Sequence, residues 1–196
     1  MKSLARFWNG RPAGLPAALL ELATAALTNL GSRLCTWVWR SNFAACGPGC
    51  KILWRPVIRH PGNIRLGAGV VLAPGVVLGS ETATGRLELE DSVWIGTHCR
   101  IDFSGHVSIG AGSTLSPGVV IYSHSHGLEP RSHPVTCEVR IGRGVWIGSG
   151  AVILQSVSEI PDGCVIGAGA LVTRSPEPGQ IIVGNPGRPL VRRAQP

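Results

Sequence analysis

A six-residue period of apolar positions dominates the chain after about residue 50. Isoleucine, leucine or valine recurs every sixth residue in groups of three, and each insertion falls between two groups. The regular groups are Leu66, Leu72 and Leu78; Leu89, Ile95 and Ile101; Ile109, Leu115 and Ile121; Ile141, Ile147 and Ile153; and Ile160, Ile166 and Val172. A less regular start is visible at Ile52, Ile58 and Ile64. This period is typical of parallel β-helices.

Small or branched residues stand four positions after these anchors. In the last two groups they are Val145, Ala151, Val157, Cys164 and Ala170. Where two anchors are six residues apart, the small residue lies two positions before the second anchor. The small residue and that anchor therefore point to the same side of an extended strand. Glycine and serine between them permit a corner every six residues. We therefore predict an all-β fold, a parallel β-helix with three strands per coil and a triangular cross-section.

Residues 1–45 lack the repeat and have apolar positions at helical spacing from Leu15 to Val38. Pro16 suits a first helical turn, and Gly31 marks a weak point or an end. Basic residues and tryptophans flank the apolar face, so the helix lies on an anionic membrane surface, packs on the β-helix, or packs on a partner chain. Glu21 interrupts the apolar run, which argues against a spanning helix and against a signal peptide. We divide the chain into a helical segment (1–50), a repeat domain (51–175) and a tail (176–196).

Charge and cysteine usage narrow the class of partner. The formal net charge is +7, yet aromatic residues are scarce and no basic helix face is evident, which favours a phosphorylated cofactor or an anionic membrane over nucleic acid. The six cysteines contain no CxxC pair. Cys99 and Cys164 occupy inward positions of the repeat, which fits a cytoplasmic protein. Cys46 and Cys50 leave open a metal site or a disulfide.

The longest insertion separates Ile121 from Ile141 and contains the sequence SHSHGLEP. Long excursions from a regular scaffold often contain functional residues, so we single out the loop at 122–140. His124 and His126 point to the same side if the strand is extended. An imidazole that titrates near neutrality is suited to remove a proton from an attacking alcohol. A polar surface loop and a metal site are the alternatives.

Three motifs follow one another in phase with the repeat: IYSHSH (121–126), VWIGSGAVIL (145–154) and IGAGALVTRS with IIVGNPGRPL (166–190). Together they resemble the hexapeptide-repeat acyltransferases with a left-handed β-helix, the galactoside, maltose and nodulation O-acetyltransferase group. The resemblance covers about residues 50–190. It implies a homotrimer, an acyl-CoA bound in the groove between neighbouring prisms, and direct acetyl transfer without an acyl-enzyme. The N-terminal segment is closer in character to acetyltransferases of polysaccharide synthesis.

The resemblance also implies roles for individual residues. His126, five residues after the anchor Ile121, matches the general base of the galactoside and maltose enzymes, with His124 in reserve. The positions that match the CoA site are Trp146, Ser149, Ala168, Thr173, Arg174 and Arg188. Main-chain groups at Ser149 and Ala168 would bind the pantetheine arm, and the two arginines would meet phosphates. The family usually has Thr-Lys where this chain has Thr173-Arg174, and some members have a basic residue where this chain has Val191.

The acceptor side is less well defined. Asp102 replaces the glycine that usually follows an anchor, and His98 and His106 are predicted to face outward on the preceding coil. All three are candidates to hold sugar hydroxyls. The sequence thus predicts an acetyl-CoA-dependent O-acetyltransferase for a sugar of a bacterial surface polysaccharide, cytoplasmic or peripheral on the inner membrane, with no required metal. Alternatives are a serine or xenobiotic acetyltransferase, a γ-carbonic-anhydrase-like zinc protein using His98, His124 and His126, and a silent trimeric scaffold.

Overall fold

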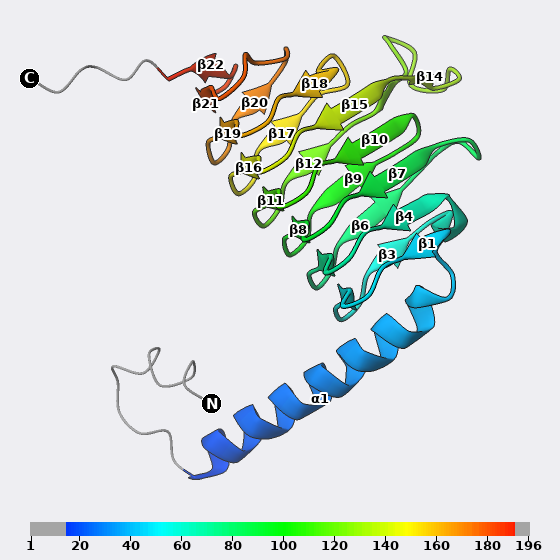
Figure 1. The fold of residues 1–196 in the computed structure, drawn as a ribbon, viewed down its shortest axis with the longest axis vertical. Helices are drawn as coiled ribbons and strands as arrows, with labels where there is room; N and C mark the ends of the chain where they lie inside the picture. Colours follow the sequence, from blue (N-terminus) through cyan, green and yellow to red (C-terminus); the bar gives the residue numbers. More distant parts are fainter. Residues whose placement is uncertain (1–14, 191–196) are drawn as a thin grey trace, which may run out of the picture.

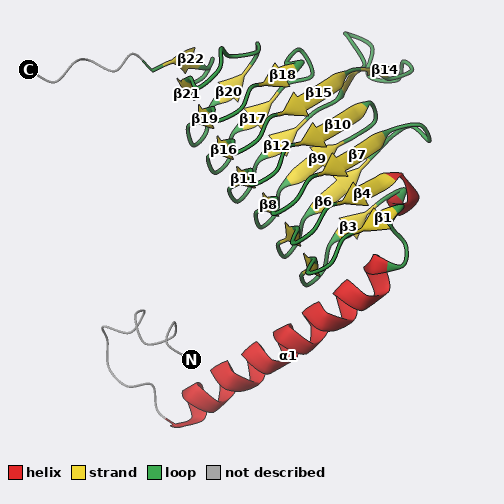
Figure 2. Cartoon of the chain, viewed as in Figure 1, coloured by secondary structure: helices red, strands yellow, loops and turns green. Residues whose placement is uncertain are grey.

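The computed structural model describes residues 15–190, which form one long helix followed by a parallel β-helix (Figures 1 and 2). Helix α1 (Leu15–Arg40) precedes the prism, and a 3₁₀ turn (Pro61–Asn63) lies in the first coil. The predicted fold class is confirmed: three parallel sheets form the three faces of the prism.

Each sheet collects one strand from each of six coils, and the second sheet has two further strands at its C-terminal end. The first sheet contains β1 (Ala45–Cys46), β4 (Ile64–Leu66), β7 (Arg86–Leu89), β10 (His106–Ile109), β15 (Glu138–Ile141) and β18 (Glu159–Ile160). The second contains β2 (Lys51–Ile52), β5 (Val71–Leu72), β8 (Trp94–Ile95), β11 (Thr114–Leu115), β16 (Trp146–Ile147), β19 (Val165–Ile166), β21 (Ile181–Val183) and β22 (Arg188–Pro189). The third contains β3 (Val57–Ile58), β6 (Val77–Gly79), β9 (Arg100–Asp102), β12 (Val120–Ile121), β17 (Val152–Ile153) and β20 (Leu171–Val172).

The register between coils confirms the predicted repeat. Ile95, Leu115 and Ile147 are aligned in the second sheet, and the anchors of the other two sheets are aligned in the same way. All fifteen predicted anchors are buried. The predicted small positions Val145, Ala151, Val157, Cys164 and Ala170 are buried too, and so is Cys99. Because each coil covers the apolar edge of the next, the core is one continuous column.

The first coil begins one strand earlier than the sequence predicted. Ile64 is not an anchor of its own; it shares β4 with Leu66, and both are buried. The first coil instead has Cys46, Ile52 and Ile58 as anchors, aligned with the anchors of the next coil. The pattern concealed this because cysteine takes the place of an aliphatic residue.

All six cysteines are free thiols, so Cys46 and Cys50 form no disulfide. Cys50 is buried, and its thiol donates a hydrogen bond to the Gly67 carbonyl oxygen at 3.0 Å. Burial and the neighbouring Cys50 raise the pKa of Cys46 to about 11. Both residues therefore have a packing role, and Cys46 stays protonated near neutral pH.

Helix α1 is confirmed, but only its C-terminal part contacts the prism. Thr36 Oγ1 accepts a hydrogen bond from the Ile52 N–H at 3.0 Å, and the rings of Trp39 and Phe43 stack with centroids 6.3 Å apart. Gly31 does not end the helix; it is buried, and a Cβ there would collide with the Trp54 ring. Residues 17–30 are exposed throughout.

No helix among residues 15–190 is long and apolar enough to cross a membrane. The basic residues before position 15 lie outside the described range.

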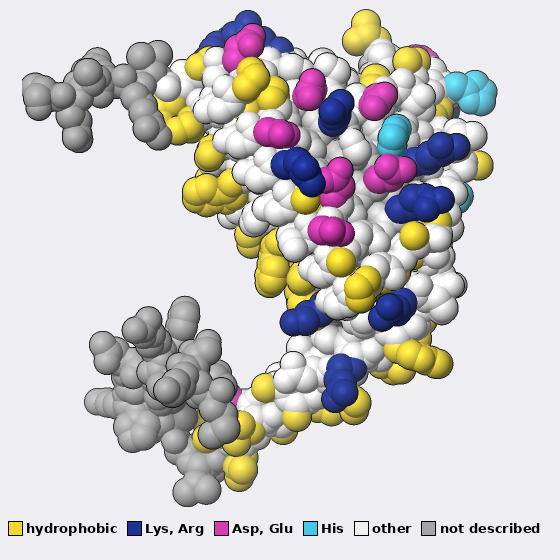
Figure 3. Space-filling view, viewed as in Figure 1, with side chains coloured by type: hydrophobic (Ala, Val, Ile, Leu, Met, Phe, Trp, Pro, Cys, Tyr) yellow, Lys and Arg dark blue, Asp and Glu magenta, His cyan; other side chains and the backbone are white. Residues whose placement is uncertain are grey.

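The three faces of the prism differ in their outward side chains. The first sheet presents charged residues: Arg65, Arg86, Glu88, Glu138, Arg140 and Glu159. The second and third sheets present mainly apolar ones, among them Val71, Trp94, Trp146, Val57, Val77 and Val152. Figure 3 shows basic and acidic side chains interspersed on the face turned to the viewer and apolar side chains along the left edge of the prism.

Candidate functional site

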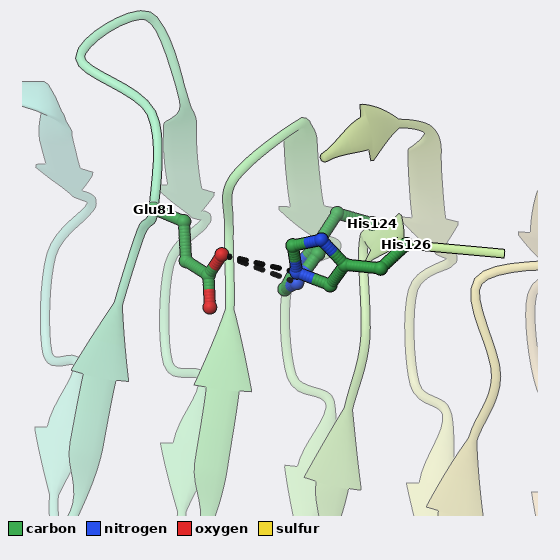
Figure 4. Close-up of side chains that lie close together, drawn as sticks. All are labelled: Glu81, His124 and His126. Atoms are coloured by element: carbon green, nitrogen blue, oxygen red, sulfur yellow. Dashed lines mark ion pairs between the residues drawn. The ribbon is translucent and has the colours of Figure 1, made fainter. Parts of the chain in front are cut away.

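Two insertions leave the prism at the corner between the third and first sheets. One spans residues 80–85, between β6 and β7; the other spans 122–137, between β12 and β15. The second insertion is shorter than the predicted loop at 122–140, because β15 already begins at Glu138. It folds back as an antiparallel pair, β13 (His124–Ser125) with β14 (Val135–Thr136), which the sequence did not predict. The two insertions bring Glu81, His124 and His126 together (Figure 4).

His124 is held from behind by a carboxylate. Its Nδ1 lies 2.7 Å from Asp102 Oδ2, at the end of β9 one coil away, and its side chain is only 12% exposed. Since an ionised carboxylate only accepts hydrogen bonds, the proton is on Nδ1. Nε2 of His124 faces Glu81, with 3.7 Å between Nε2 and Oε2.

His126 has an analogous arrangement built from its own loop. Its Nδ1 lies 2.8 Å from the carbonyl oxygen of Ser132, and the Ser132 hydroxyl donates back to the His126 carbonyl oxygen at 2.9 Å. A carbonyl oxygen can only accept, so Nδ1 again has the proton. Nε2 lies 3.2 Å from the same Glu81 oxygen. The two imidazoles meet edge to face, with centroids 5.0 Å apart.

Asp102 is the best-anchored carboxylate of the site. It accepts hydrogen bonds from the Ser104 hydroxyl (2.6 Å) and from the Ser123 N–H (2.8 Å), besides the one from His124. Burial opposes its charge, but these hydrogen bonds outweigh burial and hold the pKa of Asp102 below its ordinary value. Asp102 is therefore ionised and rigid, and fixes the ring of His124. Its predicted contact with an acceptor stays a prediction.

A cavity of about 270 Å³ lies beside His124 along the third sheet. Arg59, Arg100 and Tyr122 line it together with Glu81, Asp102 and His124, whereas its floor is formed by valines and isoleucines of the strands. Its two arginines supply positive charge. A small polar molecule in this cavity would lie next to His124.

The other two predicted acceptor residues lie elsewhere. His98 is exposed at the corner between the second and third sheets, in the left-handed region with φ of 56°, where it packs over Gly75. His106 lies in β10 of the first sheet, with its Nδ1 3.9 Å from Glu138 Oε1. Within residues 15–190, the histidine pair is grouped with Glu81 and not with His98. Within one chain, His98 thus does not join the histidine pair. The three-histidine zinc site considered from the sequence would converge across a subunit boundary and stays a prediction.

Four of the predicted CoA residues lie on the second sheet or at the corner that follows it. Ser149 and Ala168 are exposed at the corner between the second and third sheets in successive coils, where the Gly169 N–H donates to the Ser149 carbonyl oxygen at 2.9 Å. Trp146 lies on the outer face of the second sheet, 54% exposed, and its Nε1 donates to the Ser116 hydroxyl at 3.0 Å. Arg188 is exposed in β22, at the C-terminal end of that sheet.

Thr173 and Arg174 follow β20 and leave from the corner between the third and first sheets. Arg174 is exposed. The structure therefore does not bring this pair onto the edge of Ser149 and Ala168.

Sequence reasoning missed Glu81 and Tyr122. A signal for Glu81 was present: Leu78 and Leu89 are eleven residues apart instead of six, so an insertion must leave from the corner that also bears the longer excursion. Tyr122 follows directly on an anchor and gave no separate signal.

Comparisons with known proteins agree with this fold. Residues 138–174 match the family model "Hexapeptide repeat of succinyl-transferase". A chloramphenicol acetyltransferase of Agrobacterium fabrum is 47% identical over 53 residues, 27% of this chain and 25% of that protein. A putative acetyltransferase of Staphylococcus aureus, SAV2555, is 37% identical over 105 residues, 52% of each. The alignments thus span about a quarter to a half of these curated relatives.

Solved structures show the likeness over most of the prism. A mutant of AntD, an N-acyltransferase from Bacillus cereus in complex with dTDP and coenzyme A, has a TM-score of 0.71 at 19% identity, covering 81% of this chain and 88% of that one. A maltose O-acetyltransferase from Clostridium difficile has a TM-score of 0.56 at 24% identity, covering 81% and 74%. The chain is a hexapeptide-repeat β-helix protein with the fold of these acyltransferases.

Proposed function

We propose that the protein is an acetyl-CoA-dependent O-acetyltransferase that acts on a sugar hydroxyl. The observation that supports this most directly is the imidazole pair, in which each Nδ1 proton is fixed by an internal acceptor and each Nε2 is directed toward Glu81. The likeness to acetyltransferases in sequence and to sugar acyltransferases in fold points to the same reaction class. A sugar of a nascent bacterial surface polysaccharide is the proposed acceptor.

His126 is the proposed general base. Its Nε2 removes the proton of the acceptor hydroxyl while the oxygen attacks the thioester carbon. The tetrahedral intermediate then collapses, the carbon–sulfur bond breaks, and the imidazolium returns its proton to the CoA sulfur. Exposed main-chain N–H groups at the corners of the prism are suited to stabilise the oxyanion. His124, fixed by Asp102 beside the cavity, orients the acceptor and is the alternative base.

Acetyl-CoA is proposed to lie along the edge defined by Ser149 and Ala168, with Trp146 beside the arm and Arg188 near the phosphates. Arg174, with Thr173 beside it, would reach the phosphates from the other corner of the last coils. The apolar outward faces of the second and third sheets support a homotrimer, in which each cofactor groove lies between two prisms. Helix α1, with its exposed leucines, is the proposed contact with the inner membrane, where such acceptors are assembled.

Acetyl-CoA binding by calorimetry, combined with CoA release in the presence of a panel of sugars, tests the proposal. We expect binding, release that depends on the acceptor, and a loss of turnover of about 10²–10⁴-fold in His126→Ala at unchanged acetyl-CoA affinity. His133→Ala, an exposed histidine of the same excursion, is the matched control. If the full loss occurs in His124→Ala and not in His126→Ala, the base is His124. A wild-type protein that binds no acetyl-CoA would overturn the proposal and leave a non-catalytic scaffold.

A further inference from the structure

The three groups that meet at the corner between the third and first sheets form a convergent set of acceptors. Glu81 comes from one insertion, and His124 and His126 from the other; one oxygen or nitrogen atom of each lies within 4.8 Å of the others (Figure 4). Both Nε2 atoms approach the same carboxylate oxygen, at 3.7 Å and 3.2 Å.

The positions of the protons on the two imidazoles show which atoms at this point are acceptors. Both Nδ1 atoms have their proton engaged, one by Asp102 and one by the Ser132 carbonyl. In the neutral rings, Nε2 is then an acceptor, and so is the Glu81 carboxylate. Three acceptors directed at one point repel each other unless a cation lies among them, which is either a proton on an imidazole or a metal ion.

The surroundings are those of a metal ligand set. Histidines that ligate metals typically donate their second ring N–H to a carboxylate or to a backbone carbonyl, and both variants are present here. A tetrahedral zinc ion with bonds of about 2.0–2.2 Å places its donor atoms about 3.3–3.6 Å apart. The two measured nitrogen–oxygen separations, 3.2 Å and 3.7 Å, lie on either side of that range.

We propose that Glu81, His124 and His126 bind a divalent transition-metal ion of the zinc class, with a fourth position open to solvent. Two imidazole nitrogens and one carboxylate oxygen are donors that zinc prefers. The ion would occupy Nε2 of His126 and thereby exclude the proton transfer described above. Metal binding and acetyl transfer are then mutually exclusive; this second part rests on the proposed function, whereas metal binding does not.

The full-length chain, freed of metal with a chelator, is titrated with Co²⁺ under visible absorption and with Zn²⁺ by calorimetry. We expect about one ion per chain, with the strong ligand-field bands of a four-coordinate site. Glu81→Gln and His126→Ala should each weaken binding at least about 10-fold, and so should Asp102→Asn through the loss of its support for His124. His133→Ala should bind as the wild type does.

Circular dichroism of each variant shows whether it is folded, and Glu81→Gln, whose side chain is half exposed, should be the least disturbed. Ion binding that persists in Glu81→Gln and His126→Ala, or no binding by the wild type, would refute the metal site. Acetyl transfer is then measured with and without Zn²⁺. Inhibition reversed by a chelator supports mutual exclusion, and transfer that is unaffected at saturating Zn²⁺ contradicts it. A protein that binds the ion but no acetyl-CoA would retain the metal site and lose only the proposed function.

Discussion

Asp102 stabilises the site through contacts that span two coils. Its carboxylate accepts from Ser104 on its own coil and from Ser123 and His124 on the next. Removing it in Asp102→Ala leaves the Ser123 N–H without its partner in a buried place, so the free energy of unfolding at pH 7 should fall by about 2–4 kcal/mol. Urea denaturation measures this. Asp91→Ala, which removes an exposed carboxylate bonded to one backbone N–H, should cost about 1 kcal/mol.

The contribution of the Asp102 carboxylate to the free energy of unfolding depends on pH. Its pKa in the folded protein is below the ordinary value of about 3.9, so its contribution is present above that value and is lost as pH falls through the lower folded pKa. The gap between wild type and Asp102→Ala should therefore be constant from pH 7 to pH 5 and shrink below about pH 4. A gap that stays constant down to pH 2 would contradict the ionised state assigned here.

At this scale the sequence predicted burial well and contacts poorly. An anchor such as Ile147 is identified by its period alone, because its burial depends only on its place in the repeat. Asp102 also stood out, since it replaces a glycine, but its function depends on which residue of the next coil is stacked beside it. Glu81 needs in addition the path of an irregular insertion, which no period describes.

Helix α1 packs on the prism through Gly31 and Trp54, and helix propensity alone would predict the wrong effect for a substitution of this glycine. Glycine inside a helix normally costs about 1 kcal/mol relative to alanine, so Gly31→Leu should stabilise an isolated helix. Here a side chain at position 31 would collide with the Trp54 ring, which packs directly on the glycine. We expect Gly31→Leu to detach the helix from the prism and to accelerate tryptic cleavage at Arg33 and Arg40 at least about 10-fold.

The prism should remain folded in that variant, because the buried core cluster contains no residue of α1, although Trp39 packs against it. Leu27→Ala, on the exposed part of α1, is the matched control and should leave cleavage unchanged. Equal protection of Arg33 in Gly31→Leu and in the wild type would show that the contact with Trp54 does not hold the helix in place.

Elements with a strict period were predictable, and the exceptions have physical causes. The strands follow from the hexads because each anchor must be buried by the next coil. The pair of β13 with β14 is held by main-chain hydrogen bonds between residues that have no shared apolar pattern, so no periodicity indicates it. Strand β22 turns back antiparallel on β21 and closes the last coil of the second sheet, after the repeat has ended.

The distribution of outward residues over the whole prism favours assembly through two of its faces. Charged residues on the first sheet keep that face in water, whereas Trp94 on the second sheet is 47% exposed in a single chain. If this face packs against a neighbouring prism, Trp94→Asp buries an unpaired charge at a cost of several kcal/mol and should convert trimers into monomers. Ser108→Asp, on the outward side of the first sheet, should leave the trimer intact. Light scattering after size exclusion gives the mass of each.

The consequence for ligand binding separates assembly from folding. Because the proposed cofactor groove lies between two prisms, a folded Trp94→Asp monomer retains Ser149, Ala168 and Arg188 but lacks the opposite wall. It should bind acetyl-CoA at least about 10-fold more weakly than the trimer, whereas its circular dichroism stays that of the wild type. A monomer with full acetyl-CoA affinity would place the whole cofactor site on one chain. Trp146, exposed on the same sheet two coils farther along, would then serve the cofactor alone, since no neighbouring prism would be needed to complete the groove.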